Sequence, residues 1–250
     1  MQAHALIVAE ADGRGGVRLA RLRGEPPLLL RQTGPGLVYL VGGAAGPLGG
    51  DDLHLEISVG PDAALCVLTV AASVALPARS GAPSRVAVTA TVASGGTLYW
   101  LPEQVVATVN CQHRAFATVE LAEGAALLWR DELICGRHGE APGDATVGLS
   151  VSYGGRTLLR QALSVGPGAD GWAGPAVLGG AKATGSLLRV SPGVAPPLPA
   201  VLGPTAVRMP LAGPGSLVTA TAPDAHTLRG YLTEALPDGT STSASTPETA

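Results

Sequence analysis

Apolar and polar residues alternate with a period of two along much of the chain. Residues 53–59, 86–92 and 147–153 each place an apolar side chain at every second position. Because successive side chains of a strand point to opposite faces, this pattern predicts half-buried strands. A further apolar segment, 158–165, follows across Gly154-Gly155, a pair typical of a tight hairpin. The alternation therefore predicts an all-β protein, with one or two short helices at most.

A short unit recurs three times. Segments 59–65, 92–98 and 121–127 each contain an apolar residue, five polar or small residues and a second apolar residue. Each segment would join an incoming strand to an outgoing strand with the same offset. This repetition indicates stacked β-turn-β layers, although ordinary antiparallel meanders could produce it too.

The C-terminal part of the chain holds the best helix candidate, residues 224–236. Leu228, Tyr231 and Leu232 share one face at helical spacing, and Pro223 precedes the segment. After it, residues 237–250 are polar and lack apolar anchors, so we expect a disordered tail. The predicted organisation is a β-rich domain over residues 1–220, a C-terminal helix over 221–236 and the tail.

Composition and charge exclude several classes of protein. With 19 acidic and 16 basic side chains, the chain lacks the basic excess of a protein that neutralises nucleic-acid phosphates. The long uncharged stretches 32–50 and 190–207 are interrupted by glycine and proline, which argues against membrane-spanning helices. The start of the chain does not resemble a signal peptide, and the three cysteines form no disulfide framework. We expect a cytoplasmic protein that binds neither nucleic acid nor membrane.

Motifs for nucleotide binding and catalysis are weak. The glycine-rich segment 41–52 is followed by a strand pattern, whereas a dinucleotide-binding loop requires a helix at that point. The chain contains no G-x-S-x-G motif. Asp131 and Glu132 are adjacent on a predicted strand, so they point to opposite faces and form no catalytic dyad. These features favour a protein that is not an enzyme.

Cysteine and histidine pairs are candidates for metal binding. Cys111-x-His113 would place a thiolate and an imidazole on one strand face, and Cys135-x-x-His138 would bracket a turn close to Glu140. Such ligands suit zinc or nickel. Buried free cysteines more often fill a core, so a packing role for these cysteines stays open as the alternative to a metal site. A metal-dependent enzyme built on Cys135, His138 and Glu140 is the alternative function.

The segment from Trp100 to Glu140 concentrates the other candidate residues. Trp100 lies in an aromatic pair that would fill a sheet corner or contribute to a partner-binding surface. Charged side chains are scarce in this chain, and burying one is unfavourable unless it is paired or used. The candidates for partner binding or for a polar ion path, as opposed to solvated turns, are Trp100, Glu103, Asp131, Glu132, Arg137 and Glu140.

Two blocks of sequence resemble a known family. Residues 41–72 are similar to the glycine-rich entry and first long hairpin of the urease accessory protein UreD (UreH) family. Residues 98–140 resemble the most characteristic block of that family, with its W-x-P-x-E/Q segment, its G-A-x-L-x-W-x-E strand and its G-R-x-x-x-G-E-like close, which is shortened here to residues 136–140. The resemblance covers roughly residues 35–235.

The resemblance implies an elongated, β-helical fold and a non-enzymatic scaffold. Members of the family assemble with UreF and the GTPase UreG on apo-urease and assist nickel insertion into the urease active site. This implies no tightly bound cofactor but a transient nickel ion. If the charged residues between Trp100 and Glu140 line a path for that ion, we expect Cys135 and His138 to be auxiliary ligands. A homodimer within the complex is left open.

Overall fold

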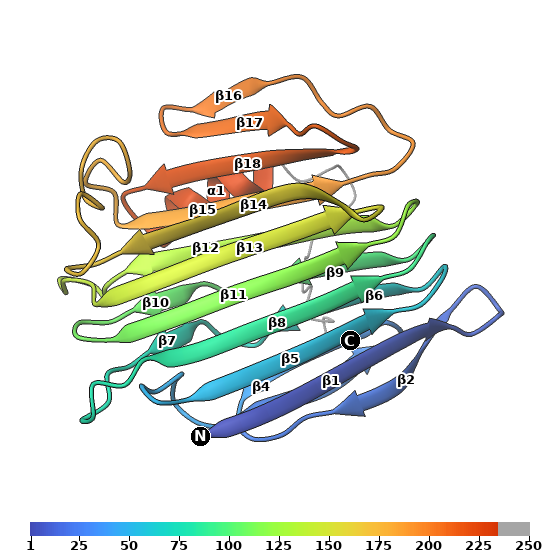
Figure 1. The fold of residues 1–250 in the computed structure, drawn as a ribbon, viewed down its shortest axis with the longest axis horizontal. Coiled ribbons are helices and arrows are strands. Elements are labelled where there is room, and N and C mark those ends of the chain that lie inside the picture. The colour runs from blue at the N-terminus through green and yellow to red at the C-terminus, as the bar shows by residue number, and fades with distance from the viewer. Residues whose placement is uncertain (235–250) are drawn as a thin grey trace, which may run out of the picture.

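Two β-sheets lie face to face in the computed structural model, which describes residues 1–234 (Figure 1). The seven-stranded sheet contains, in spatial order, β14 (Arg156–Val165), β13 (Asp144–Tyr153), β11 (Gln112–Leu121), β8 (Ser84–Val92), β5 (Asp52–Val59), β1 (Gln2–Ala11) and β2 (Val17–Arg23). The main path of the eleven-stranded sheet is β16 (Ala200–Gly203), β17 (Ala206–Pro210), β18 (Gly215–Ala222), β15 (Ala183–Val190), β12 (Ala126–Cys135), β9 (Thr97–Leu101), β6 (Ala64–Thr69), β4 (Leu37–Gly42) and β3 (Leu28–Gly34). Two short strands, β7 (Ser73–Ala75) and β10 (Val105–Ala107), extend it.

The chain passes repeatedly from one sheet to the other, which confirms the stacked layers. β5, β8 and β11 are parallel neighbours in the seven-stranded sheet, and each is followed directly by β6, β9 or β12 in the other sheet. The residues that begin the three repeated units, Val59, Val92 and Leu121, lie in register. The residues that end the units are in register on the eleven-stranded sheet in the same way. The arrangement resembles a β-solenoid and is not an antiparallel meander.

The three connecting turns share one backbone conformation. In each, the backbone N–H of the fourth turn residue donates to the carbonyl of the first, at 3.3, 2.9 and 3.1 Å. The third residue has a positive φ in every copy: 56° at Asp62, 74° at Gly95 and 83° at Gly124. A turn with positive φ at this position selects glycine, and aspartate is among the few other residues that tolerate it. The shared turn geometry explains why the three copies keep the same length.

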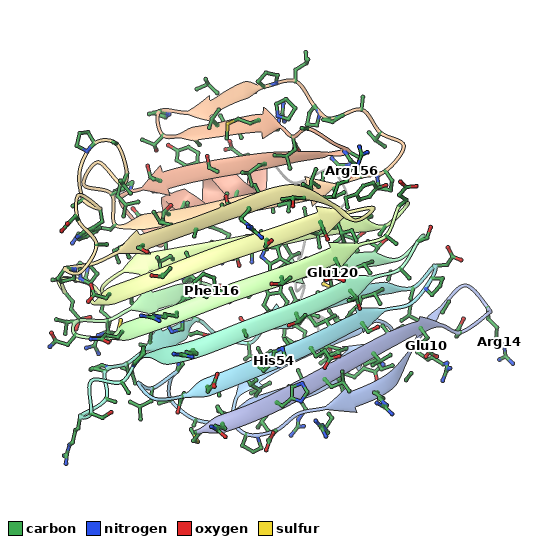
Figure 2. The ribbon with its side chains drawn as sticks, in the orientation of Figure 1. Glu10, Arg14, His54, Phe116, Glu120 and Arg156 are labelled. Carbon is green, nitrogen blue, oxygen red and sulfur yellow. The ribbon has the colours of Figure 1, made fainter. Side chains whose placement is uncertain are left out.

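The main hydrophobic core fills the space between the sheets. Alternate residues of β5, among them Leu55 and Ile57, point inward and are buried against residues such as Leu65 and Leu98 of the opposite sheet. On the outer face of the seven-stranded sheet, His54 and Glu120 lie among other polar side chains, with Phe116 exposed beside them (Figure 2). The predicted alternation is therefore correct for this sheet, because one of its faces is solvated.

Helix α1 (Ala225–Glu234) covers part of the outer face of the eleven-stranded sheet. Asp224 caps it by accepting a hydrogen bond of 2.7 Å from the backbone N–H of Thr227. Leu228 and Leu232 are fully buried against β15 and β18. The helix lies within the predicted segment, and the predicted tail falls outside the described residues. No helix within residues 1–234 is long and apolar enough to cross a membrane.

The predicted hairpin is present as β13 and β14, joined by Gly154 and Gly155 with φ of 56° and 76°. The segment 166–204, which is rich in glycine and proline, contains β15 and β16. The glycine-rich segment 41–52 connects β4 to β5, with no helix after it.

Candidate functional site: an inter-sheet cavity and a buried ion-pair cluster

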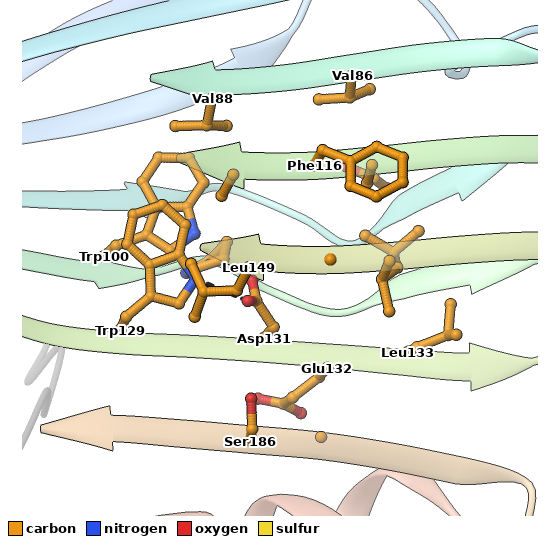
Figure 3. Close-up of a pocket in the computed structure, with 18 of the residues that line it drawn as sticks. Val86, Val88, Trp100, Phe116, Trp129, Asp131, Glu132, Leu133, Leu149 and Ser186 are labelled. Carbon is orange, nitrogen blue, oxygen red and sulfur yellow. Dashed lines mark hydrogen bonds between the residues drawn. The ribbon is translucent and has the colours of Figure 1, made fainter. Parts of the chain in front are cut away.

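A cavity of about 300 Å³ lies between the two sheets (Figure 3). Its wall is mostly apolar and includes Trp100, Trp129, Leu133 and Leu149. Trp100 and Trp129 stack on one another, with ring centroids 5.0 Å apart and an angle of 20° between the ring planes. Trp100 is therefore an interior residue that shapes the cavity. A packing residue, the alternative to a partner-binding residue, would occupy such a position.

Asp131 projects into this cavity from β12 (Figure 3). The indole N–H of Trp129 donates to its carboxylate at 2.6 Å. Burial raises the pKa of Asp131 to about 6, although the hydrogen bond from Trp129 opposes the shift. At neutral pH this carboxylate carries a negative charge inside a mainly apolar chamber.

His113 of β11 is another ionisable group on the cavity wall. Only 3% of its surface is exposed, and its Nδ1 lies 2.9 Å from the hydroxyl oxygen of Ser84 on β8. Burial lowers the pKa of His113 to about 4, so the imidazole is neutral at physiological pH.

On the opposite face of β12, Arg130 and Glu132 point toward α1. Oε1 of Glu132 accepts a hydrogen bond from Nε of Arg229 of α1 at 2.6 Å and forms an ion pair with Nε of Arg130 at 2.9 Å. Its Oε2 is buried and has no hydrogen-bond partner among the described residues. Burial raises the pKa of Glu132 even though the two guanidinium groups lower it. The side chains of Asp131 and Glu132 thus leave β12 in different directions, as the strand geometry predicted, and Glu132 also borders the cavity together with Glu103 (Figure 3).

Glu103 belongs to the same cluster as Glu132. Arg229 donates to its carboxylate at 3.0 Å and to the amide oxygen of Gln104 at 3.3 Å. Arg130 donates to the carbonyl of Pro102 at 2.9 Å. Two guanidinium groups therefore balance two carboxylates, and the cluster ties the loop after β9 to β12 and to α1.

The remaining candidates lie at the turn after β12. Arg137 and Glu140 form an exposed ion pair at 2.8 Å, which lowers the pKa of Glu140 to about 2 through hydrogen bonds from Arg137. Cys135 is buried in a core cluster with Cys111, and burial raises its thiol pKa to about 11. His138 is exposed in the turn, so the structure does not bring Cys135 and His138 to one site. Within residues 1–234, no three His, Cys, Asp or Glu side chains are arranged to hold a metal ion.

Comparison with known proteins identifies the family. A family model described as the UreD urease accessory protein matches residues 2–237. The chain belongs to the UreD family. A urease accessory protein UreD from Streptomyces griseus is 49% identical, over 94% of this chain and 96% of the relative. A UreD protein from Streptomyces avermitilis is 45% identical over the same shares, and one from Frankia alni is 43% identical over 96% and 93%. The predicted family and fold are confirmed.

UreD membership assigns the chain an accessory role and not an enzymatic one. Within this UreD chain, sequence reasoning gave no role to Arg229 or Arg130, which neutralise the carboxylates of Glu103 and Glu132. The sequence did contain a signal that Arg229 contacts the sheet, since Arg229 lies beside the buried Leu228 on the predicted helix. The roles of Cys135, His138, Arg137 and Glu140 in metal or partner binding stay predictions.

Proposed function

We propose that this UreD chain is a scaffold that assembles with UreF and UreG on apo-urease and assists insertion of nickel into the urease active site. The observation that carries the proposal is the inter-sheet cavity with the Asp131 carboxylate on its wall, in a chain of the UreD family. Nickel is the cargo of this process, and GTP hydrolysis is assigned to UreG.

The cavity supports a path in which nickel is held only weakly. A buried negative charge attracts a divalent cation, because a chamber with apolar walls screens the charge poorly. The hydrogen bond from Trp129 fixes the orientation of the Asp131 carboxylate without adding a metal ligand. One carboxylate does not close a coordination sphere, so we expect affinity in the range of about micromolar or weaker. Weak binding suits transfer, because the ion must leave.

Partner docking is assigned to surface groups near the cavity. Arg137 and Glu140 hold the turn after β12 in one conformation and leave His138 exposed. Glu103 is partly exposed where the loop after β9 meets α1. We place UreF or urease contacts at these two positions, and the protein acts within their complex in the cytoplasm.

The alternative of a metal-dependent enzyme receives no support from the geometry. It requires Cys135, His138 and Glu140 to act on one metal ion. Cys135 is directed into a core cluster with a thiol that stays protonated at neutral pH, whereas His138 is exposed to solvent. Family membership also assigns an accessory role.

Co-expression tests the proposal. The tagged chain is expressed with UreF, UreG and apo-urease, and the purified material is examined for all partners and for urease activity after nickel is supplied. We expect a complex that contains UreF and urease, and urease activation that is lost when the chain is omitted. Purification of the chain without any partner, together with full urease activation in its absence, would overturn the proposal.

A further inference from the structure

The environment of His113 differs from that of the other four histidines. His4, His54, His138 and His226 do not line the cavity, whereas His113 does and is almost fully buried. A buried histidine normally hydrogen-bonds through both ring nitrogens or packs as a neutral ring. Here the described residues supply a partner to Nδ1 only.

Ser84 is the hydrogen-bond partner of Nδ1 of His113. Its hydroxyl oxygen lies 2.9 Å from Nδ1 and 3.4 Å from the backbone carbonyl oxygen of Gln112. Nε2 is therefore the ring nitrogen without a partner among the described residues, on a ring that borders the cavity. Histidine ligands of metals typically have a second ring nitrogen that donates to a neighbouring oxygen, and Ser84 Oγ is placed to accept such a bond.

The cavity wall offers two kinds of donor to a cation. Carboxylates come from Asp131, Glu103 and Glu132, and an imidazole comes from His113. Carboxylate oxygens suit Mg²⁺, Ca²⁺ and Mn²⁺, whereas imidazole suits nickel, zinc and copper.

We propose that Nε2 of His113 is a transition-metal contact inside the cavity and selects nickel-like divalent ions over Mg²⁺. The proposal rests on the proposed nickel path and adds its selectivity element. Asp131 attracts any divalent cation, and His113 retains only ions that accept nitrogen ligands. A single imidazole keeps the binding weak, in agreement with the absence of a three-ligand cluster within residues 1–234.

Nickel titration of the purified chain, or of its UreF complex if only that stays in solution, tests the proposal without urease. Isothermal titration with nickel chloride is performed with and without millimolar magnesium chloride on the parent chain and on His113→Gln, which keeps a polar side chain of similar size. We expect His113→Gln to lose one nickel site or to weaken it at least tenfold, and the remaining binding to become sensitive to Mg²⁺. The His226→Ala variant, at an exposed position on α1 outside the cavity lining, is the matched control and should keep the magnesium-resistant site.

Two further measurements make the result independent of folding and of maturation. Ser84→Ala retains the imidazole but removes the hydroxyl that hydrogen-bonds to its Nδ1, and should weaken the site by about tenfold. With Cu²⁺ as the probe, electron paramagnetic resonance should show nitrogen coupling that disappears in His113→Gln. If His113→Gln and Ser84→Ala both bind nickel as the parent does, the proposal is wrong. If the site is lost but urease matures normally, the metal contact stands and the proposed nickel path fails.

Discussion

Arg229 of helix α1 donates to the carboxylate of Glu132 on β12 at 2.6 Å, although 97 residues separate the two in sequence. The same guanidinium contacts Glu103 at 3.0 Å, in the loop that follows β9. The position of α1 on the sheet is therefore specified by charge as well as by the burial of Leu228 and Leu232. Removing one partner from such a cluster leaves a buried carboxylate less compensated.

Arg229→Ala should destabilise the chain by about 1–3 kcal/mol, because Glu132 would then rely on Arg130 alone. The midpoint of urea denaturation measures the effect. Arg160→Ala is the control, since Arg160 is exposed on β14 and forms no ion pair within residues 1–234. Equal effects of the two substitutions would show that the cluster does not hold α1.

Replacing glycine by alanine should have opposite effects on stability at two positions, one in a stacked turn and one in α1. Gly124→Ala should destabilise by about 1–2 kcal/mol, because its φ of 83° is unfavourable for alanine. Gly230→Ala lies in an exposed part of α1 with free space around it and should stabilise by up to about 1 kcal/mol. Thermal denaturation of both variants checks the signs. Stabilisation by Gly124→Ala would contradict the assigned turn.

Asp131 should make stability depend on pH in a defined direction. Its pKa is raised from 3.8 in the unfolded chain to about 6 in the fold, so ionisation opposes folding. The resulting destabilisation is absent below about pH 4, grows through pH 6 and is complete above it, reaching at most about 3 kcal/mol. Asp131→Asn should therefore be more stable than the parent at pH 8 and equal to it at pH 3.5. Denaturation at both pH values tests this, and a constant difference would contradict it.

The edge strand β16 should promote self-association when the chain is expressed alone. Leu198 and Val201 are 81% and 82% exposed beside this unpaired edge, in a chain with few charges. Co-expressed UreF should keep the chain in solution, and Leu198→Lys with Val201→Lys should reduce association in its absence. Val70→Lys, at an exposed position away from β16, is the control. A monodisperse parent chain at roughly tens of micromolar, measured by sedimentation velocity, would contradict this expectation.

The stacked layers could be predicted because local turn chemistry determines them. Asp62, Gly95 and Gly124 hold the same position in three turns of equal length, so the repeat is visible in the sequence. Alternation likewise identified β5 and β8, whose outer faces are solvated. On β12 alternation fails, because α1 buries one face and the opposite sheet buries the other. Residues 127–135 are therefore apolar on both faces, apart from the charged residues near the centre.

The candidate site could be predicted only in part. The charges of Asp131 and Glu132 are conspicuous in a charge-poor chain, and their opposite directions follow from strand geometry. Their partners could not be predicted, since the packing of α1 on the sheet brings Arg229 to Glu132 and the pairing of β8 with β11 brings Ser84 to His113. The cavity also depends on the spacing of the two sheets, for which the sequence carries no local signal.

The nickel content of urease matured with Asp131→Asn tests the central claim most directly. The variant keeps the shape of the side chain and an oxygen that accepts from Trp129, but it removes the charge from the cavity. Urease is matured in cells with the parent chain, with Asp131→Asn or with Glu120→Gln, an exposed control on the outer face of the seven-stranded sheet. Nickel per urease active site is then measured, and the complex with UreF is quantified in parallel. We expect Asp131→Asn to lower the nickel content several-fold while the complex forms normally and Glu120→Gln matches the parent. Full nickel content with Asp131→Asn, in an intact complex, would contradict a nickel path through the cavity.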